Sequence, residues 1–172
     1  MRSGAVRACV ELARRTGAVA CFEGSPEMAA FLAPTAAANA TDGGGAAARA
    51  PLALLRPEQE STVEEIVAFC REHALSLSVL GGGHTCHSAA PGTICVDLRG
   101  LNQCAVVGRG RARHAAIRCQ GGASLGQIAR VAAESNYVVP LGTAPTVGAG
   151  AVLMGGVGHL SRLHGMRVAN IL

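Results

Sequence analysis

Leu77-Ser78-Val79-Leu80-Gly81-Gly82-Gly83-His84-Thr85 is the stretch around which this chain is organised. Its first four residues form an apolar run typical of a buried strand, and three glycines end that run. Because glycine lacks a Cβ, the backbone at such a break can turn sharply and bring its N–H groups close to an anion. The stretch therefore predicts either a phosphate-binding loop with His84 beside it or a plain tight turn.

The composition indicates a globular protein. The chain has 172 residues, 49% of them apolar, which is enough for one domain with a substantial core. Its net charge of +4 is modest, and the most basic segment, Arg109–His114, has no aromatic residue beside it. We expect that segment to be a solvated hairpin turn, and we expect no nucleic-acid partner. No stretch is apolar enough for a transmembrane helix, so we expect no membrane partner.

The cysteines predict a reduced protein without a zinc site. There are seven, an odd number, and none forms a C-x-x-C pair, which favours buried thiols and an intracellular setting. Glu11 and several arginines interrupt any secretory signal near the start, and localisation is otherwise unknown. His84, Cys86 and His87 lie close together, but no second ligand cluster follows at a zinc-like spacing. We expect no metal, and a metal- or anion-binding module is an alternative function.

The first 46 residues read as an extension that precedes the main domain. Residues 1–33 have the spacing of one or two short helices, and Ser25-Pro26 has the form of a helix start. Residues 36–50 are rich in alanine and glycine and predict a loop. The domain proper is expected to span residues 47–172.

A strand, a helix and a second strand then follow within about thirty residues, the length of a βαβ unit. Leu52–Leu55 is the first strand, and Ser61–Glu64 has the form of a capping box at the start of the helix. Val67 is among the residues expected on the buried face of that helix. Leu77–Leu80 is the second strand. This order places the glycine turn at the carboxyl end of a parallel strand, where open α/β sheets bind ligands.

The later part of the chain predicts four further strands, two of them paired as a hairpin, and a capped helix. Ile94–Leu98 reads as a strand, and Cys104–Val107 with Ala115–Cys119 reads as an antiparallel pair. Ser124–Gln127 is a second capping box, and Tyr137–Pro140 reads as a short strand. After it, glycines recur from position 142 to 165 among apolar residues, a composition suited to backbone that lies against a large flat ligand.

Six motifs, taken in order, point to one family: Leu54-Leu55-Arg56-Pro57, Gly82-Gly83-His84-Thr85, Val96-Asp97-Leu98, Gly121–Leu125, Pro145-Thr146-Val147-Gly148 and Gly155–Arg162. In this order and spacing they resemble the FAD-binding domain of the vanillyl-alcohol oxidase/PCMH flavoproteins. The resemblance is closest to the berberine-bridge-enzyme-like FAD-linked oxidoreductases, and it covers about residues 51–172.

The resemblance implies an α+β fold of two small α/β subdomains that grip FAD, the one expected cofactor. It assigns the pyrophosphate to the first glycine loop and the flavin and ribityl chain to the second glycine segment. The implied FAD contacts are Gly81, Gly82, Gly83, His84, Thr85, Ser88, Gly142, Thr143, Pro145, Thr146, Val147, Gly148, Gly150, Gly155, Gly156, Val157 and Gly158. In many relatives the histidine at the position of His84 is bonded covalently to the flavin.

The implied activity is oxidation of an alcohol, a sugar or a related small molecule, with hydride passing to the flavin and O2 as acceptor. The family's substrate domain and its catalytic base follow the FAD domain, and we expect this chain to be truncated before them. No catalytic residue is therefore assigned. A remnant with weak or no FAD binding is the alternative, because four positions depart from the family pattern: Leu80, Ser88, Met154 and Ala169.

Overall fold

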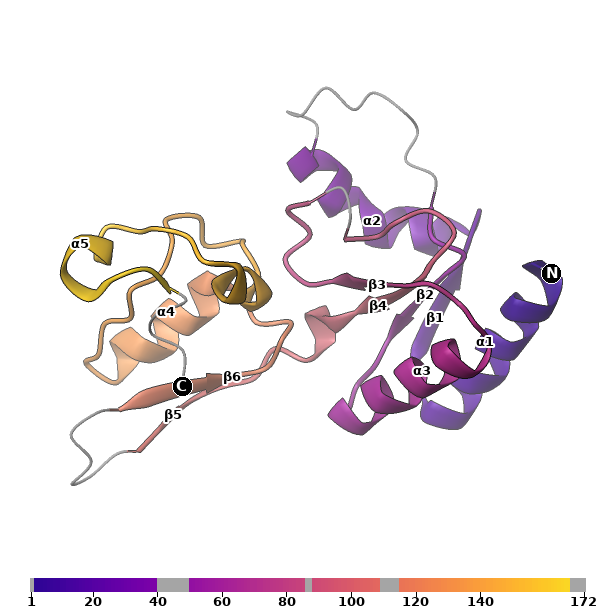
Figure 1. Cartoon of the computed structure of the whole chain (residues 1–172), viewed down its shortest axis with the longest axis horizontal. Coiled ribbons are helices and arrows are strands. Elements are labelled where there is room, and N and C mark those ends of the chain that lie inside the picture. Colours follow the sequence, from indigo (N-terminus) through magenta and orange to yellow (C-terminus); the bar gives the residue numbers. More distant parts are fainter. Residues whose placement is uncertain (1, 40–49, 86–87, 109–114, 168–172) are drawn as a thin grey trace. The chain divides into compact units, whose positions relative to one another are not determined.

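The chain divides into two compact units, Met1–Leu101 and Asn102–Leu172. The structure is a computed structural model that describes residues 2–39, 50–85, 88–108 and 115–167. Each unit combines helices with a small sheet, so the predicted α+β fold of two α/β subdomains is confirmed (Figure 1).

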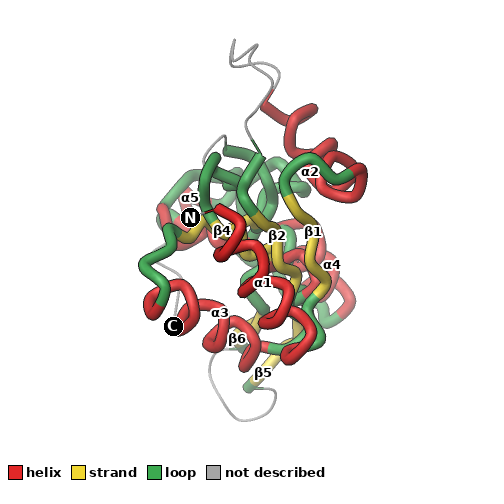
Figure 2. Tube along the Cα trace, turned by 90° about the vertical axis from the view of Figure 1, so that its right-hand side faces the viewer, coloured by secondary structure: helices red, strands yellow, loops and turns green. Residues whose placement is uncertain are grey.

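The first unit is a four-stranded sheet between helices. Its strands, in spatial order, are β1 (Val19–Phe22), β2 (Ala53–Arg56), β4 (Ile94–Asp97) and β3 (Leu77–Leu80). Strand β1 is antiparallel to β2, whereas β2, β4 and β3 are mutually parallel. Helices α1 (Arg2–Thr16) and α3 (Glu60–Glu72) lie on one face of this sheet, and α2 (Pro26–Asn39) lies on the other (Figure 1, Figure 2).

Alternation along the central strands builds a core on each face of the sheet. Leu55 and Val96 belong to the buried cluster that contains residues of α1 and α3. Their neighbours Leu54 and Cys95 point to the opposite face and belong to the cluster that contains Met28 of α2. Because both faces are covered, the first three residues of β2 and of β4 are apolar, as expected for central parallel strands, and each strand ends in a charged residue, Arg56 or Asp97.

The βαβ unit is confirmed, with one addition and two corrections. Strand β4 lies between β2 and β3 and pairs with both. The predicted capping box at Ser61 is wrong, because α3 already begins at Glu60 and its N-cap, Gln59, makes no side-chain capping bond. The predicted inward position of Val67 is also wrong, since its side chain is 49% exposed.

The N-terminal region is not made of helices alone. Strand β1 was not predicted, and it joins the sheet by pairing with β2. The helix start at Ser25-Pro26 is confirmed, because the backbone N–H of Met28 donates to Ser25 Oγ at 3.1 Å and α2 begins at Pro26. Of the predicted loop at residues 36–50, Ala36–Asn39 are helical, and residues 40–49 lie outside the described residues.

The second unit is a hairpin, a capped helix and an irregular glycine-rich segment. Strands β5 (Cys104–Val107) and β6 (Ala116–Cys119) pair as predicted, while the basic turn at 109–114 lies outside the described residues. The capping box of α4 (Leu125–Glu134) is confirmed. The predicted strand at Tyr137–Pro140 is wrong, since these residues have no regular structure. Two short helical turns follow, η3 (Ala149–Met154) and α5 (Ser161–His164). No helix in the described ranges is long and apolar enough to cross a bilayer.

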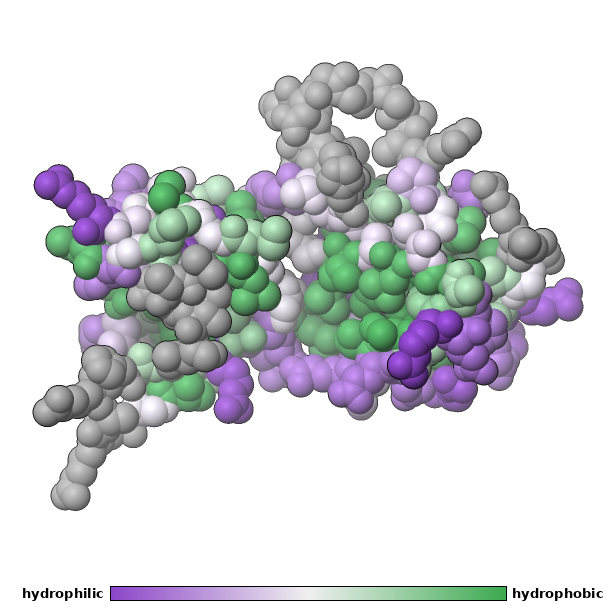
Figure 3. Space-filling model, in the orientation of Figure 1, coloured by the Kyte–Doolittle hydropathy of each residue, from purple (hydrophilic) through white to green (hydrophobic). Residues whose placement is uncertain are grey.

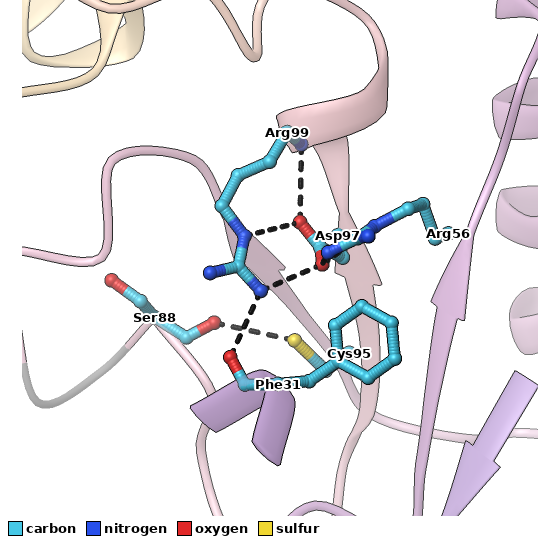
Figure 4. Close-up of polar contacts among 6 residues, drawn as sticks. All are labelled: Phe31, Arg56, Ser88, Cys95, Asp97 and Arg99. Atoms are coloured by element: carbon cyan, nitrogen blue, oxygen red, sulfur yellow. Dashed lines mark hydrogen bonds and ion pairs between the residues drawn. The ribbon is translucent and has the colours of Figure 1, made fainter. Parts of the chain in front are cut away.

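A buried carboxylate joins the elements of the first unit. Asp97, at the end of β4, is fully buried and lies between two arginines (Figure 4). Arg56 of β2 donates through Nε to Oδ2 at 3.0 Å, and Arg99, from the short turn η2 (Leu98–Gly100), donates through Nε to Oδ1 at 2.9 Å. Burial alone would raise the pKa of Asp97, but the hydrogen bonds from Arg99 and Arg56 outweigh it and lower the pKa below its usual value.

Asp97→Asn tests this network. We expect the substitution to lower the free energy of unfolding at pH 7 by about 3 kcal/mol, because both arginines lose their charge partner. Because the folded-state pKa is lowered, the stabilisation is present above the ordinary aspartate pKa and is lost as the pH falls towards the folded-state value. The difference between wild type and variant should therefore be constant at neutral pH and shrink below about pH 4.

Urea unfolding at a series of pH values measures this difference. Glu64→Gln is the matched control, because Glu64 is exposed on α3, and it should change stability by less than about 0.5 kcal/mol. An Asp97→Asn variant as stable as the wild type at pH 7 would show that the network does not stabilise the fold.

Candidate functional site

The carboxyl ends of three parallel strands meet at one edge of the first sheet. Strand β2 ends at Arg56, β4 ends at Asp97 and β3 ends at Leu80, immediately before Gly81. Leu80 and Asp97 are register partners, so the glycine loop leaves the sheet beside the arginine–aspartate network. This is the edge at which parallel α/β sheets bind ligands, and the predicted position of the loop is confirmed.

The first glycine loop presents unpaired backbone donors. The N–H groups of Gly81, Gly82 and Gly83 donate to no carbonyl among the residues that the structure describes. Gly83 is buried and has a φ of +74°, a left-handed conformation that favours glycine. Consecutive N–H groups at such a turn form a concavity that suits an anion. The geometry therefore favours the phosphate loop over the plain tight turn.

The far end of this loop is tied back to the sheet. Thr85 Oγ1 and Ser88 Oγ lie 2.8 Å apart, and the N–H of Ser88 donates to the carbonyl of Thr85 at 3.2 Å. The carbonyl of Ser88 in turn accepts from the Cys95 thiol of β4 at 3.5 Å (Figure 4). Thr85 and Ser88 thus hold the loop's exit, while the side chain of His84 is exposed.

The family pattern has a basic residue at the position of Leu80, and in this chain positive charge is found elsewhere at the same edge of the sheet. Leu80 is fully buried in the apolar cluster that contains Met28, so it is a packing residue. Arg56 and Arg99 both bind Asp97, and two guanidinium groups against one carboxylate leave one net positive charge beside the end of β3. Such a charge favours a bound phosphate.

The metal alternative has no support among the described residues, which contain no cluster of three His, Cys, Asp or Glu side chains that could hold an ion. Of the three residues proposed for that site, Cys86 and His87 lie outside the described residues.

The second unit fixes its Pro-Thr-Val-Gly segment against the start of α4. The N–H of Leu125 donates to the carbonyl of Val147 at 2.8 Å, and the N–H of Gly126 donates to the carbonyl of Pro145 at 2.9 Å. The next N–H, that of Gln127, donates to Ser124 Oγ at 3.2 Å. The backbone N–H groups of the first turn of α4 therefore already have acceptors within the protein. The turn at 121–125 thus anchors the Pro-Thr-Val-Gly segment and does not offer an anion site.

Some glycines of the second segment are required by the chain itself. A Cβ on Gly158 would overlap the carbonyl oxygen of Leu141, and one on Gly156 would overlap the guanidinium of Arg167. Gly156 also has a φ of +101°. At Gly150, by contrast, a Cβ would meet open space. Close packing of the chain thus explains part of the glycine content, and an added ligand is not needed for those positions.

Arg167 is a residue of this segment that the sequence motifs did not identify. Its guanidinium lies between Gly142 and Gly156, with Nη1 close to the former and Nη2 close to the latter. Its Nε is the one buried side-chain nitrogen or oxygen without a hydrogen-bond partner among the described residues. A buried cationic donor without an acceptor is costly unless a ligand supplies one. The signal available in the sequence was an arginine at the end of a glycine-rich apolar segment.

The same segment exposes large apolar side chains. Leu153, Met154 and Val157 are 66%, 89% and 71% exposed, and green surface marks this part of the second unit in Figure 3. Met154 stands where the family pattern has a glycine, and its side chain projects to solvent without crowding its neighbours. Exposed apolar groups of this kind suit contact with a flat, largely apolar ring.

The predicted residues therefore fall into two groups. Gly81–Thr85 and Ser88 surround the sheet edge of the first unit, and the residues from Gly142 to Gly158 lie in the irregular segment of the second. Within each group the structure brings the predicted residues together.

Comparison with known sequences agrees with this arrangement. The profile of an FAD-binding domain matches residues 51–172. An uncharacterised FAD-linked oxidoreductase of Bacillus subtilis, YvdP, is 29% identical over 126 residues, which cover 71% of this chain and 27% of that protein. Berberine bridge enzyme-like 18 of Arabidopsis thaliana is 29% identical over 129 residues, covering 71% of this chain and 24% of that protein. The chain thus spans about a quarter of the length of these relatives.

Solved structures with the same fold include an oxidase and a protein with dehydrogenase activity. The 6-hydroxy-D-nicotine oxidase of Arthrobacter nicotinovorans superposes with a TM-score of 0.76 at 25% identity, over 90% of this chain and 32% of that one. Phl p 4, a grass pollen allergen with glucose dehydrogenase activity, gives a TM-score of 0.74 at 26% identity, again over 90% of this chain and 32% of that one. The superposed 90% of this chain is more than residues 51–172 contain, so the structural similarity extends into the first 50 residues.

Proposed function

Because this chain belongs to the FAD-binding domain family of the FAD-linked oxidoreductases, we propose that each of its two glycine segments contributes to FAD binding. The observation that carries the proposal is that the N–H groups of Gly81–Gly83, at the carboxyl end of parallel strand β3, have no carbonyl partner among the described residues. The residues fit the group, because FAD brings a doubly charged pyrophosphate and a flat ring with polar edges. Each part of that cofactor has a chemically matching surface on the chain.

The first unit binds the pyrophosphate in this proposal. Backbone N–H groups of Gly81–Thr85 donate to the phosphate oxygens, and the net positive charge of the Arg56–Asp97–Arg99 network lowers the cost of holding two negative charges. The contact between Thr85 and Ser88 keeps the loop in its turned conformation. Ser88 therefore acts by positioning the loop.

The second unit binds the flavin and the ribityl chain. Pro145–Gly148 is immobilised on the first turn of α4, so it presents a fixed backbone edge to the ring. Leu153 and Val157 offer apolar contact. The buried Nε of Arg167 donates to an oxygen of the cofactor and thereby gains the acceptor that the described residues do not provide.

The reaction class proposed is oxidation of an alcohol, a sugar or a related small molecule, with O2 as the final acceptor. Support comes from relatives whose names are those of oxidases and dehydrogenases. Bound FAD supplies the electron-accepting chemistry. The chain's own contribution is to bind and orient the cofactor and to shield one side of it from water. The substrate and the catalytic base are not assigned to any described residue.

His84 is proposed as the covalent attachment point, because its exposed side chain lies on the cofactor loop. Protein reconstituted with FAD should then give a fluorescent band on a denaturing gel. In His84→Ala that band should vanish, while flavin absorbance before denaturation persists. His159→Ala is the control, since His159 is also exposed but lies in the last glycine-rich segment, and it should keep the band. A band that survives in His84→Ala would rule out attachment at this residue.

Arg167→Met tests the second half of the site. We expect the dissociation constant for FAD to rise about tenfold or more, because a charge-assisted hydrogen bond contributes about 1.5–3 kcal/mol. Quenching of FAD fluorescence on titration with protein measures this constant. Arg162→Met is the matched control, since Arg162 is exposed on the neighbouring turn α5, and it should change the constant less than about twofold.

Thermal unfolding of both variants checks that the fold is intact. Unchanged affinity in a folded Arg167→Met protein would remove Arg167 from the site, and the absence of FAD binding in the folded wild type would contradict the proposed function itself.

A further inference from the structure

Two cysteines face each other across the hairpin of the second unit. Cys104 of β5 and Cys119 of β6 are direct register partners in the antiparallel pair. Residues that are directly opposite in such a pair point to the same face of the sheet. Both thiols are free in this structure, and both side chains are half-buried.

The hydrogen-bond pattern identifies which kind of pair this is. At the next position along the hairpin, the N–H of Gln120 donates to the carbonyl of Gln103 at 2.9 Å, which makes Gln103 and Gln120 a hydrogen-bonded pair. Hydrogen-bonded and non-hydrogen-bonded pairs alternate along antiparallel strands, so Cys104 and Cys119 form a non-hydrogen-bonded pair. The Cα atoms of such pairs are about 4.5 Å apart, within the range of about 4.4–6.8 Å that a disulfide spans.

The two thiols also share one environment. Both side chains pack on the buried cluster formed by Ala123, Leu125, Ile128 and Ala149. Burial raises the pKa of both thiols, and the neighbouring Cys119 raises that of Cys104 further. Both thiols are therefore mainly protonated at neutral pH, and their oxidation by a peroxide is expected to become faster as the pH rises, because the thiolate is the reacting form.

We propose that Cys104 and Cys119 are a redox-sensitive pair that a peroxide converts into a cross-strand disulfide. One thiol, as its thiolate, attacks a peroxide oxygen and becomes a sulfenic acid, and the second thiol displaces that hydroxyl to form the S–S bond. The two sulfurs lose two electrons and two protons, and hydrogen peroxide takes them up as two molecules of water. Reduction by a dithiol reverses the change.

Closure of this bond would stabilise the unit that carries the Pro-Thr-Val-Gly segment. The bond would close the hairpin over the residues from 104 to 119, which restricts the unfolded chain. Val147 and Val152 pack on the same cluster as the two cysteines, so the oxidised hairpin would also hold the glycine-rich segment more firmly. The inference does not depend on FAD.

Two cysteines of the four-stranded sheet in the first unit cannot form a disulfide with each other. Cys21 of β1 and Cys95 of β4 are both partners of Leu54 on the intervening strand β2. Two strand spacings separate them, about 9.6 Å, which is more than a disulfide can span. They provide an internal control for non-specific oxidation.

Peptide mapping after oxidation tests the proposal. Cleavage at arginine places Cys104 in the peptide 100–109 and Cys119 in the peptide 119–130, with one cysteine in each. Folded protein is treated with hydrogen peroxide, its remaining thiols are alkylated, and it is digested without reductant. We expect one dominant linked pair, 100–109 with 119–130, and a melting temperature about 5 °C higher that falls back after reduction.

Cys104→Ser and Cys119→Ser should each abolish the linked peptide and the thermal shift while folding normally, as circular dichroism would report. If either variant fails to fold, the wild-type map alone still decides. Peptides 100–109 and 119–130 that remain separate after Cys104 and Cys119 have been oxidised, or that link equally to other cysteines, would overturn the proposal. The proposal would also be overturned if Cys104 and Cys119 stayed fully reduced at a peroxide concentration that oxidises the fully buried Cys95.

Discussion

Asp97 is the group that fixes the geometry of the sheet edge at which β2, β4 and β3 end and the first glycine loop begins. Its carboxylate joins β2 through Arg56 and the turn after β4 through Arg99. The same two arginines reach α2 on one face of the sheet, because Arg99 Nη2 donates to the carbonyl of Phe31 at 3.1 Å and the guanidinium of Arg56 lies 4.2 Å from the centre of the Phe31 ring. One buried charge thus fixes three elements around the end of β3, where the glycine loop begins.

Glycine is present in the two glycine segments for different physical reasons. In the first, the backbone donors of Gly81–Gly83 have no carbonyl partner among the described residues, which is the state expected of a preformed anion site. In the second, Gly156 and Gly158 are glycine because neighbouring atoms of the chain occupy the space of a side chain. A high glycine content alone therefore does not identify a ligand site, whereas the accounting of backbone donors separates the two cases.

The sequence predicted most of the fold, because its motifs lie within local elements. Strands β3 and β5 were predicted to the residue, and the capping box of α4 is local chemistry that a short sequence reveals. Strand β1 escaped prediction, because Val19–Phe22 is stabilised by pairing with β2, which is distant in the sequence. The strand predicted at Tyr137–Pro140 is wrong for the opposite reason: its residues favour a strand, but no strand in the described part of the chain pairs with them.

The parts of the site that sequence reasoning missed are contacts between distant residues. The approach of Arg167 to Gly142 and Gly156 depends on the path of an irregular segment that no local pattern specifies. The positive charge supplied by Arg56 and Arg99 likewise required the strand order β2-β4-β3, which brings both arginines to one edge. Burial of Leu80 then explains why that position can lack a basic residue.

Hydrogen–deuterium exchange with and without saturating FAD tests the central claim most directly, because it reads each glycine segment separately. The account predicts slower exchange in the peptides that cover residues 81–85 and 142–158, while α1, which lies outside both segments, is unchanged. Protection of neither segment, or protection confined to the rest of the chain, would contradict the claim that these two segments hold the cofactor.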